Sequence, residues 1–221
     1  HYPLRRQRQM CIRDRYGLMP AISRLVLERA CSDNKELIAE GLLDVPVAVN
    51  ICSNSFLQSD FIGQVSATLR RVGLPASRLE IEITESIAIH DISLAVKTIL
   101  ALHDIGVEVS MDDFGTGYSS PGTLKRLPID RLKIDRAFIS ELPHNEFDRA
   151  IVQATLILAK SIGMQVVAEG IENEEQLCFL QQNGCSYGQG YWYARPLPLS
   201  KLKNLLASKE EIHGKNLLFK N

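Results

Sequence analysis

The feature that most constrains the fold of this chain is a repeated unit: a helix-like segment, a glycine, a short apolar run, and a carboxylate where the run stops. The runs LEIEITE, VEVSMDD and MQVVAE show it, at residues 79–85, 107–113 and 164–169. A β-branched run that follows a helix and a glycine is typical of a buried strand in a parallel sheet. Carboxylates at the ends of several parallel strands would lie on one face of a barrel, where barrel enzymes place their active sites.

The unit recurs along the chain and predicts an alternation of strands and helices. Strands are expected at residues 47–50, 79–84, 107–112, 131–135, 165–169 and 188–193. Helices are expected around residues 22–30 and at 56–72, 91–103, 148–162, 174–182 and 199–207. Such alternation implies parallel strands joined by right-handed crossovers.

Two α/β architectures fit this alternation. A doubly wound open sheet usually places its site in one crevice, where the strand order reverses. Here polar residues lie at or near the end of every predicted strand, which favours a ring. We therefore expect a TIM-like (β/α) barrel, for which 221 residues is somewhat short of the usual length of about 250.

Composition excludes several classes of protein. A hydrophobic content of 45% suits one globular domain with a sizeable core, and a formal net charge of −1 gives no global field that would select nucleic acid or an anionic membrane. The chain has no membrane-spanning apolar stretch and no signal-peptide pattern. Its five scattered cysteines form no CxxC pair, which predicts free thiols in a reducing compartment. We expect a cytoplasmic domain.

The two ends of the chain differ from its middle. Residues 1–15 contain five arginines and follow neither apolar period, and we interpret them as a foreign or frame-lost leader in preference to a basic arm for nucleic acid. Residues 16–207 are expected to form the barrel domain, and residues 208–221 a polar tail.

Oxygen-bearing side chains end, or nearly end, four of the predicted strands: Asn50, Glu82, Asp112, Asp113 and Glu169. Such ligands suit Mg²⁺ or Mn²⁺, and no pair of histidines or cysteines has zinc spacing. The adjacent aspartates reach one site only where the strand ends and bends, and Gly115 and Gly117 supply that bend. A solvated turn is the alternative for this pair taken alone, but carboxylates gathered at a barrel mouth need a cation or protons.

Three further polar residues are candidates for the same site. Lys133 lies between apolar neighbours on a short strand and should face a polar centre, where it would hold or activate a water; snorkelling to solvent is the alternative. Glu172, three residues after Glu169, is expected in the following loop, as a positioning group or a solvated glutamate. Gln189, in the segment GQGY, would hold substrate or water, or belong to an ordinary turn.

Six segments of the chain, in this order, resemble the motifs of EAL domains, the cyclic di-GMP-specific phosphodiesterases of bacteria. They are VNICS, EITES, DDFGTGYSS, LKID, AEGIE and QGY, between residues 49 and 191. The resemblance extends from about residue 17 to about residue 202. It implies a modified TIM barrel that uses two Mg²⁺ or Mn²⁺ ions to hydrolyse one phosphodiester of cyclic di-GMP, giving linear pGpG.

The resemblance also implies a role for each residue of the metal site. Asn50, Glu82 and Asp112 would bind the first metal ion. Asp112 would bridge to the second ion, which Asp113 and Glu169 complete.

Outside the metal site, the resemblance implies supporting roles. Lys133 would orient the attacking water, and Glu85 would brace the loop after Asp113. Glu172 and Gln189 would support water and substrate. The implied partners are cyclic di-GMP, a second copy of the chain in a homodimer, and an N-terminal sensory or regulatory domain.

The chain departs from the family pattern at its front. The Glu-Ala-Leu segment that names the family should precede the helix around residues 22–30, and no such segment occurs in this sequence. The two strands that open the family's barrel are also missing, so we expect a barrel without its first strands and with weak or absent hydrolysis. Two alternatives are a degenerate EAL-like module that binds cyclic di-GMP or a protein partner and, with less support, a metal-dependent lyase or aldolase.

Overall fold

The structure is a computed structural model that describes residues 19–87, 91–115 and 121–208. The predicted leader at residues 1–15 lies outside the described residues, as does the tail beyond residue 208. The proposed domain boundaries therefore stay predictions.

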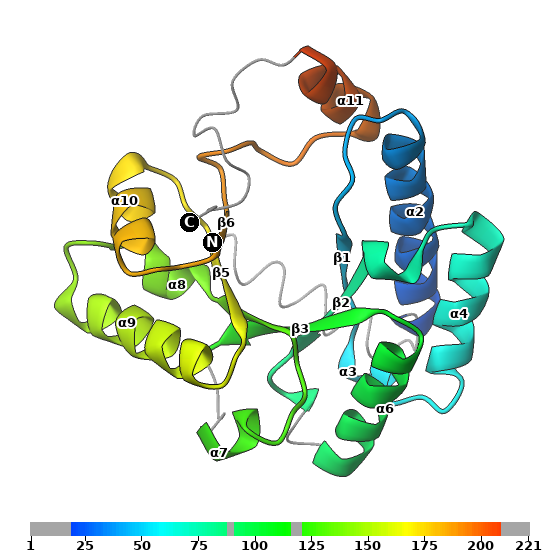
Figure 1. The fold of residues 1–221 in the computed structure, drawn as a ribbon, viewed down its shortest axis with the longest axis horizontal. Coiled ribbons are helices and arrows are strands. Elements are labelled where there is room, and N and C mark those ends of the chain that lie inside the picture. The colour runs from blue at the N-terminus through cyan, green and yellow to red at the C-terminus, as the bar shows by residue number, and fades with distance from the viewer. Residues whose placement is uncertain (1–18, 88–90, 116–120, 209–221) are drawn as a thin grey trace.

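Six parallel strands form one sheet whose spatial order follows the sequence, β1-β2-β3-β4-β5-β6. The sheet curls into a half-barrel (Figure 1). No reversal interrupts the strand order, so the barrel expectation is confirmed over the doubly wound sheet. The strands are β1 Val47–Asn50, β2 Leu79–Thr84, β3 Glu108–Phe114, β4 Arg131–Ile134, β5 Gln165–Glu169 and β6 Tyr187–Gln189.

Helices cover the outer side of the curled sheet (Figure 1). The longer ones are α2 Met19–Ala39, α4 Phe61–Val72, α6 Ile92–Asp104, α9 Glu146–Ser161, α10 Glu174–Gln182 and α11 Leu199–Ser208. The short ones are α3 Ser53–Phe56, η1 Ala76–Arg78, α7 Pro121–Leu124 and α8 Arg136–Ile139.

The predicted single helix at residues 56–72 is wrong. The structure has two helices there, α3 and α4, with a break between Phe56 and Phe61. Both rings are buried, with centroids 5.5 Å apart. In an unbroken helix, side chains five residues apart point about 140° apart, so the break allows both rings to face the core.

The predicted last strand, residues 188–193, is also too long. β6 ends at Gln189, because the backbone then packs against the loop after β5. The Ile171 amide donates to the Gln189 carbonyl at 3.0 Å, and the Trp192 amide donates to the Ile171 carbonyl at 2.9 Å. A Cβ on Gly190 would lie 2.1 Å from the Ile171 oxygen, so this crossing requires a glycine.

The hydrophobic core lies between the sheet and the helices, because alternate strand residues face opposite sides. Apolar residues such as Ile81, Val109 and Leu132 are fully buried. Polar residues occupy most of the alternating positions on the inner face, with Ala48 and Val167 as apolar exceptions.

The C-terminal helix returns to the first described helix. Lys203 of α11 pairs with Glu36 of α2, and its Nζ lies 2.5 Å from Glu40 Oε1. Among the described residues, β1 and β6 are each paired on one side only. Within the same ranges, no helix is long and apolar enough to cross a membrane.

Candidate active site at the strand ends

Lys133 of β4 lies at the centre of a cluster of carboxylates from three other strands. Its Nζ is 2.5 Å from Glu82 Oε1 of β2 and 2.5 Å from Glu169 Oε1 of β5, and it is 3.7 Å from Asp112 Oδ1 of β3. Only 4% of Lys133 is exposed, so it does not snorkel to solvent. One ammonium group therefore links the acidic side chains of three strands.

The charges in this cluster depend on one another. Burial raises the pKa of Glu82 and of Glu169, and Lys133 offsets part of that rise. Burial by itself lowers the pKa of Lys133, but Glu82, Glu169 and Asp112 raise it by more. Lys133 is consequently held as a cation among the carboxylates.

Asn50 ends β1 and orients Glu82. Its Nδ2 donates to Glu82 Oε2 at 2.5 Å, while Glu82 Oε1 accepts from Lys133. The two Cα atoms are direct register partners in the parallel pair of β1 and β2. Both oxygens of Glu82 are thus engaged, one with a neighbouring strand and one with a strand across the sheet.

The end of β3 bends at the aspartate pair. The register with β4 shifts between Met111 and Phe114, and Asp113 adopts a positive φ of 57°. The Asp113 amide donates to Asp112 Oδ1 at 3.0 Å. This bend allows two adjacent residues to line the same cavity. Burial, followed by the charges of Asp112 and Asp135, raises the pKa of Asp113 to about 6.

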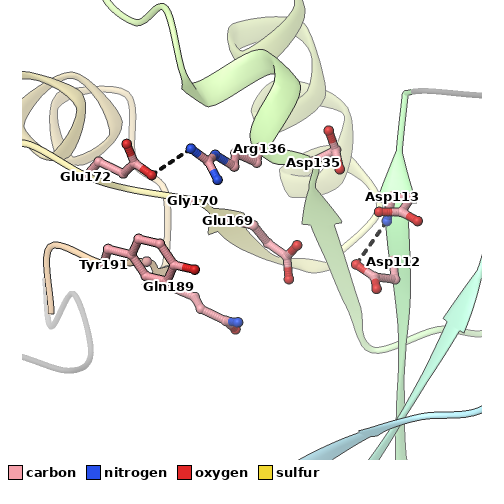
Figure 2. A pocket seen from close by; sticks show the side chains of 10 residues that line it. Asp112, Asp113, Asp135, Arg136, Glu169, Gly170, Glu172, Gln189 and Tyr191 are labelled. Carbon is pink, nitrogen blue, oxygen red and sulfur yellow. Dashed lines mark hydrogen bonds and ion pairs between the residues drawn. The ribbon is translucent and has the colours of Figure 1, made fainter. Parts of the chain in front are cut away.

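A cavity of about 380 Å³ opens at this end of the strands (Figure 2). In Figure 2, Glu169 projects into the space between the aspartate pair and Gln189. The residues that line the cavity are Asp112, Asp113, Asp135, Arg136, Glu169, Gly170, Glu172, Gln189, Gly190 and Tyr191.

The structure brings most of the predicted site residues to this cavity. Five of them line it, and Lys133 joins Glu82 to two of those five. Asn50 contacts Glu82 but lines a neighbouring cavity of about 370 Å³, next to α2. Glu85, predicted as a loop brace, is buried just beyond β2 and lines neither of these cavities.

Besides two glycines, three lining residues were not predicted as site residues: Asp135, Arg136 and Tyr191. Asp135 follows β4 directly, so it carries the same signal as the others, a carboxylate where an apolar run stops. Its carboxylate accepts from the Ala137 amide at 2.7 Å and caps α8. Arg136 Nη2 lies 2.7 Å from Glu172 Oε1, a contact between the start of α8 and the loop after β5 that no local pattern indicates.

The donor set fits a hard divalent cation in its chemistry. All the candidate ligands offer oxygen, and the raised pKa of Asp113 reflects crowding that a cation would relieve. Within the described residues, no three His, Cys, Asp or Glu side chains are arranged to hold an ion. Lys133 instead draws Glu82 and Glu169 to itself, so an ion and Lys133 would compete for these carboxylates.

The sequential parallel sheet and the acidic cavity at its carboxyl edge, next to the Lys133 cluster, define a class: TIM-like (β/α) barrel proteins with their site at the ends of the strands. The sequence profile of the EAL domain matches residues 7–196. The chain belongs to the EAL domain family, which confirms the resemblance. The match begins at residue 7, and the boundary at residue 16 stays a prediction.

Curated relatives with assigned activities are similar over most of this chain. The cyclic di-GMP phosphodiesterase NbdA of Pseudomonas aeruginosa is 40% identical over 190 residues, which cover 86% of this chain and 24% of NbdA. The bifunctional diguanylate cyclase/cyclic di-GMP phosphodiesterase MucR of the same organism is 40% identical over 189 residues, which cover 86% of this chain and 28% of MucR. The chain therefore spans about a quarter of the length of these relatives.

Solved structures agree with the fold. The P. aeruginosa MucR phosphodiesterase in complex with c-di-GMP superposes with a TM-score of 0.83 at 39% identity, covering 87% of this chain and 78% of that one. The EAL domain of Mycobacterium smegmatis DcpA gives a TM-score of 0.80 at 38% identity, covering 84% of each chain. The TIM-like barrel expectation is thereby confirmed.

Proposed function

We propose that this domain hydrolyses cyclic di-GMP to linear pGpG with the help of two Mg²⁺ or Mn²⁺ ions. The observation that carries the proposal is the buried Lys133 ammonium, held by carboxylates of three strands at the edge of an acidic cavity. The relatives' assigned activity on cyclic di-GMP supports the choice of substrate.

The metal-binding residues are those that the resemblance to EAL domains implies. Asn50, Glu82 and Asp112 would hold the first ion, and Asp112, Asp113 and Glu169 would hold the second. When bound, the ions lower the pKa of a coordinated water and neutralise charge on the phosphate. The Asn50 hydrogen bond to Glu82 fixes the orientation of this carboxylate in advance.

The remaining polar residues act on water and substrate. Lys133 is a buried cation with donors directed at the same carboxylates, so it is placed to orient a water among them. Glu172 is braced by Arg136, and Gln189 sits beside Glu169 as its register partner. Correct placement of the water relative to the phosphate supplies much of the rate.

A binding module without turnover is the second candidate. One observation favours it: Lys133 pairs with both Glu82 and Glu169, the carboxylates that a metal ion would also need. A homodimer, an N-terminal regulatory domain and a cytoplasmic location in a bacterium belong to the same proposal. The lengths of the curated relatives, of which this chain covers about a quarter, support additional domains.

Chromatography of linear product tests the proposal. The purified chain is incubated with cyclic di-GMP and Mn²⁺ or Mg²⁺, with and without chelator, beside a chain extended upstream by an EAL-family front segment that includes the Glu-Ala-Leu glutamate. We expect weak turnover by the chain as it stands and chelator-sensitive formation of pGpG by the extended chain. In the extended chain, Asp112→Ala should lower kcat by roughly 10²-fold or more.

Two outcomes decide between the candidates. Chelator-resistant hydrolysis, or full activity of Asp112→Ala, would refute the two-metal site. Tight binding of cyclic di-GMP with no pGpG from either chain would favour the binding module.

A further inference from the structure

A second ionic layer lies inside the half-barrel, beneath Lys133. Arg131 precedes Lys133 by two residues on β4, so both side chains point to the inner face. The Arg131 Nη1 pairs with Glu80 of β2 and lies 2.6 Å from Glu108 Oε2 of β3. The side chains of Arg131 and Glu80 are only 15% and 10% exposed, whereas Glu108 is 41% exposed, so the Arg131–Glu80 pair is the buried part of this network.

Arg131 also reaches the strands on its other side. Its Nε donates to Gln165 Oε1 of β5 at 3.0 Å. Its guanidinium carbon lies 5.8 Å from the centroid of the Tyr187 ring on β6. One planar side chain thus contacts side chains of four strands besides its own.

The strands that supply carboxylates to Lys133 also supply polar partners to Arg131. β2, β3 and β5 each supply a carboxylate to Lys133 and a polar partner to Arg131 from the same inner face. The pairs on these strands are Glu80 and Glu82, Glu108 and Asp112, and Gln165 and Glu169. Arg131 therefore links, one layer below, the three strands that carry the carboxylates around Lys133.

We propose that Arg131 is a positioning residue for the metal-binding carboxylates of this domain; the inference rests on the proposed function. The guanidinium fork directs donors to β2, β3 and β5 at once, and this fixes how far apart Glu82, Asp112 and Glu169 stand. A lysine would keep the charge but lose the planar fork that serves three acceptors. The competing explanation is a buried ion network that stabilises the barrel without affecting the site.

Four variants of the purified chain separate these explanations. Arg131→Lys keeps the charge, Arg131→Met removes it, and Glu80→Gln with Arg131→Met removes the charge together with its most buried carboxylate partner. Ser110→Ala is the matched control, because Ser110 lies between the layers on β3, is fully buried, and has no hydrogen-bond partner for its Oγ among the described residues. For each variant, Mn²⁺ affinity is measured by calorimetry and the melting temperature by circular dichroism, with titrations at a temperature where the variant is folded.

The positioning role predicts that affinity and stability separate. Arg131→Met should lose both stability and Mn²⁺ affinity. The double variant should recover stability, because the uncompensated Glu80 charge is gone, yet bind Mn²⁺ on the order of tenfold more weakly than the parent. Arg131→Lys should melt close to the parent and also bind more weakly, and Ser110→Ala should match the parent in both measurements.

Parental Mn²⁺ affinity in the folded double variant or in Arg131→Lys would overturn the positioning role and leave only a structural one. If the parent chain itself binds no Mn²⁺, the proposed function fails and the inference fails with it. If the parent binds and the variants bind equally well, the inference alone is refuted.

Discussion

At the scale of single residues, the sequence predicts the direction in which Lys133 points but not the residues that it contacts. Its apolar neighbours on a short strand predict that it faces the inside of the sheet. They do not predict its partners, because contact with Glu82 and Glu169 depends on the register of strands that lie 51 and 36 residues away in sequence, which only the folded sheet sets. The aspartate pair and its glycine bend, in contrast, are local features and could be identified directly.

Lys133 is expected to be important for stability as well as chemistry. Lys133→Met in the metal-free chain leaves Glu82 and Glu169 buried without their cation, and breaking such a pair costs about 3–5 kcal/mol. Urea unfolding at pH 7 measures the loss. The exposed Lys160→Met is the matched control and should change stability by about 0.5 kcal/mol or less. A loss below about 1 kcal/mol for Lys133→Met would show that the cluster is not coupled to folding.

The raised pKa of Asp113 predicts that the stability of the folded chain depends on pH. Its folded pKa is raised from the ordinary 3.8 to about 6, so ionisation destabilises the folded state; the cost is absent below about pH 4 and complete above about pH 6. In chelator, Asp113→Asn should therefore gain melting temperature over the parent as pH rises from 4 to 7, on the order of a few degrees. Asp104→Asn, an exposed aspartate on α6, is the control. A difference that is flat or falls with pH would contradict the raised pKa.

At the scale of elements, the sequence predicts strands better than it predicts where helices and loops end. Five strands match to within one or two residues, because each is a short run of alternating or continuous apolar residues that stops at a polar residue. The two errors, the helix at 56–72 and the overlong last strand, have a common cause. Phe56 and Phe61 meet in the core, and Gly190 packs against the backbone of Ile171. Neither contact can be recognised from the neighbouring residues in the sequence.

The crossing at Gly190 is expected to tolerate no side chain. Gly190→Ala places a Cβ 2.1 Å from the Ile171 oxygen and 2.3 Å from its nitrogen, both rigid backbone atoms. We expect a loss of about 2 kcal/mol or more and a displaced Gln189. Gly63→Ala, in the first turn of α4 with no atom within 4 Å of the added Cβ, should instead stabilise by about 0.4–1 kcal/mol. Thermal melting of both variants checks the contrast, and equal effects would contradict it.

At the scale of the whole molecule, the parallel half-barrel leaves β1 and β6 paired on one side within the described residues. Unpaired strand edges promote association between chains. We expect the purified chain to oligomerise as concentration rises, measured by light scattering behind size exclusion. A monodisperse monomer that melts cooperatively would show that the edges are covered.

The carboxylates around Lys133 are proposed to form a divalent-metal site for cyclic di-GMP. Anomalous diffraction from crystals grown with Mn²⁺ and cyclic di-GMP tests this proposal, because manganese positions are read without assuming any ligand. We expect two manganese peaks that share Asp112, with Asp113 and Glu169 at one of them and a phosphate of cyclic di-GMP beside both. Manganese bound elsewhere, or cyclic di-GMP seated away from this cavity while Lys133 still bridges Glu82 and Glu169, would contradict it.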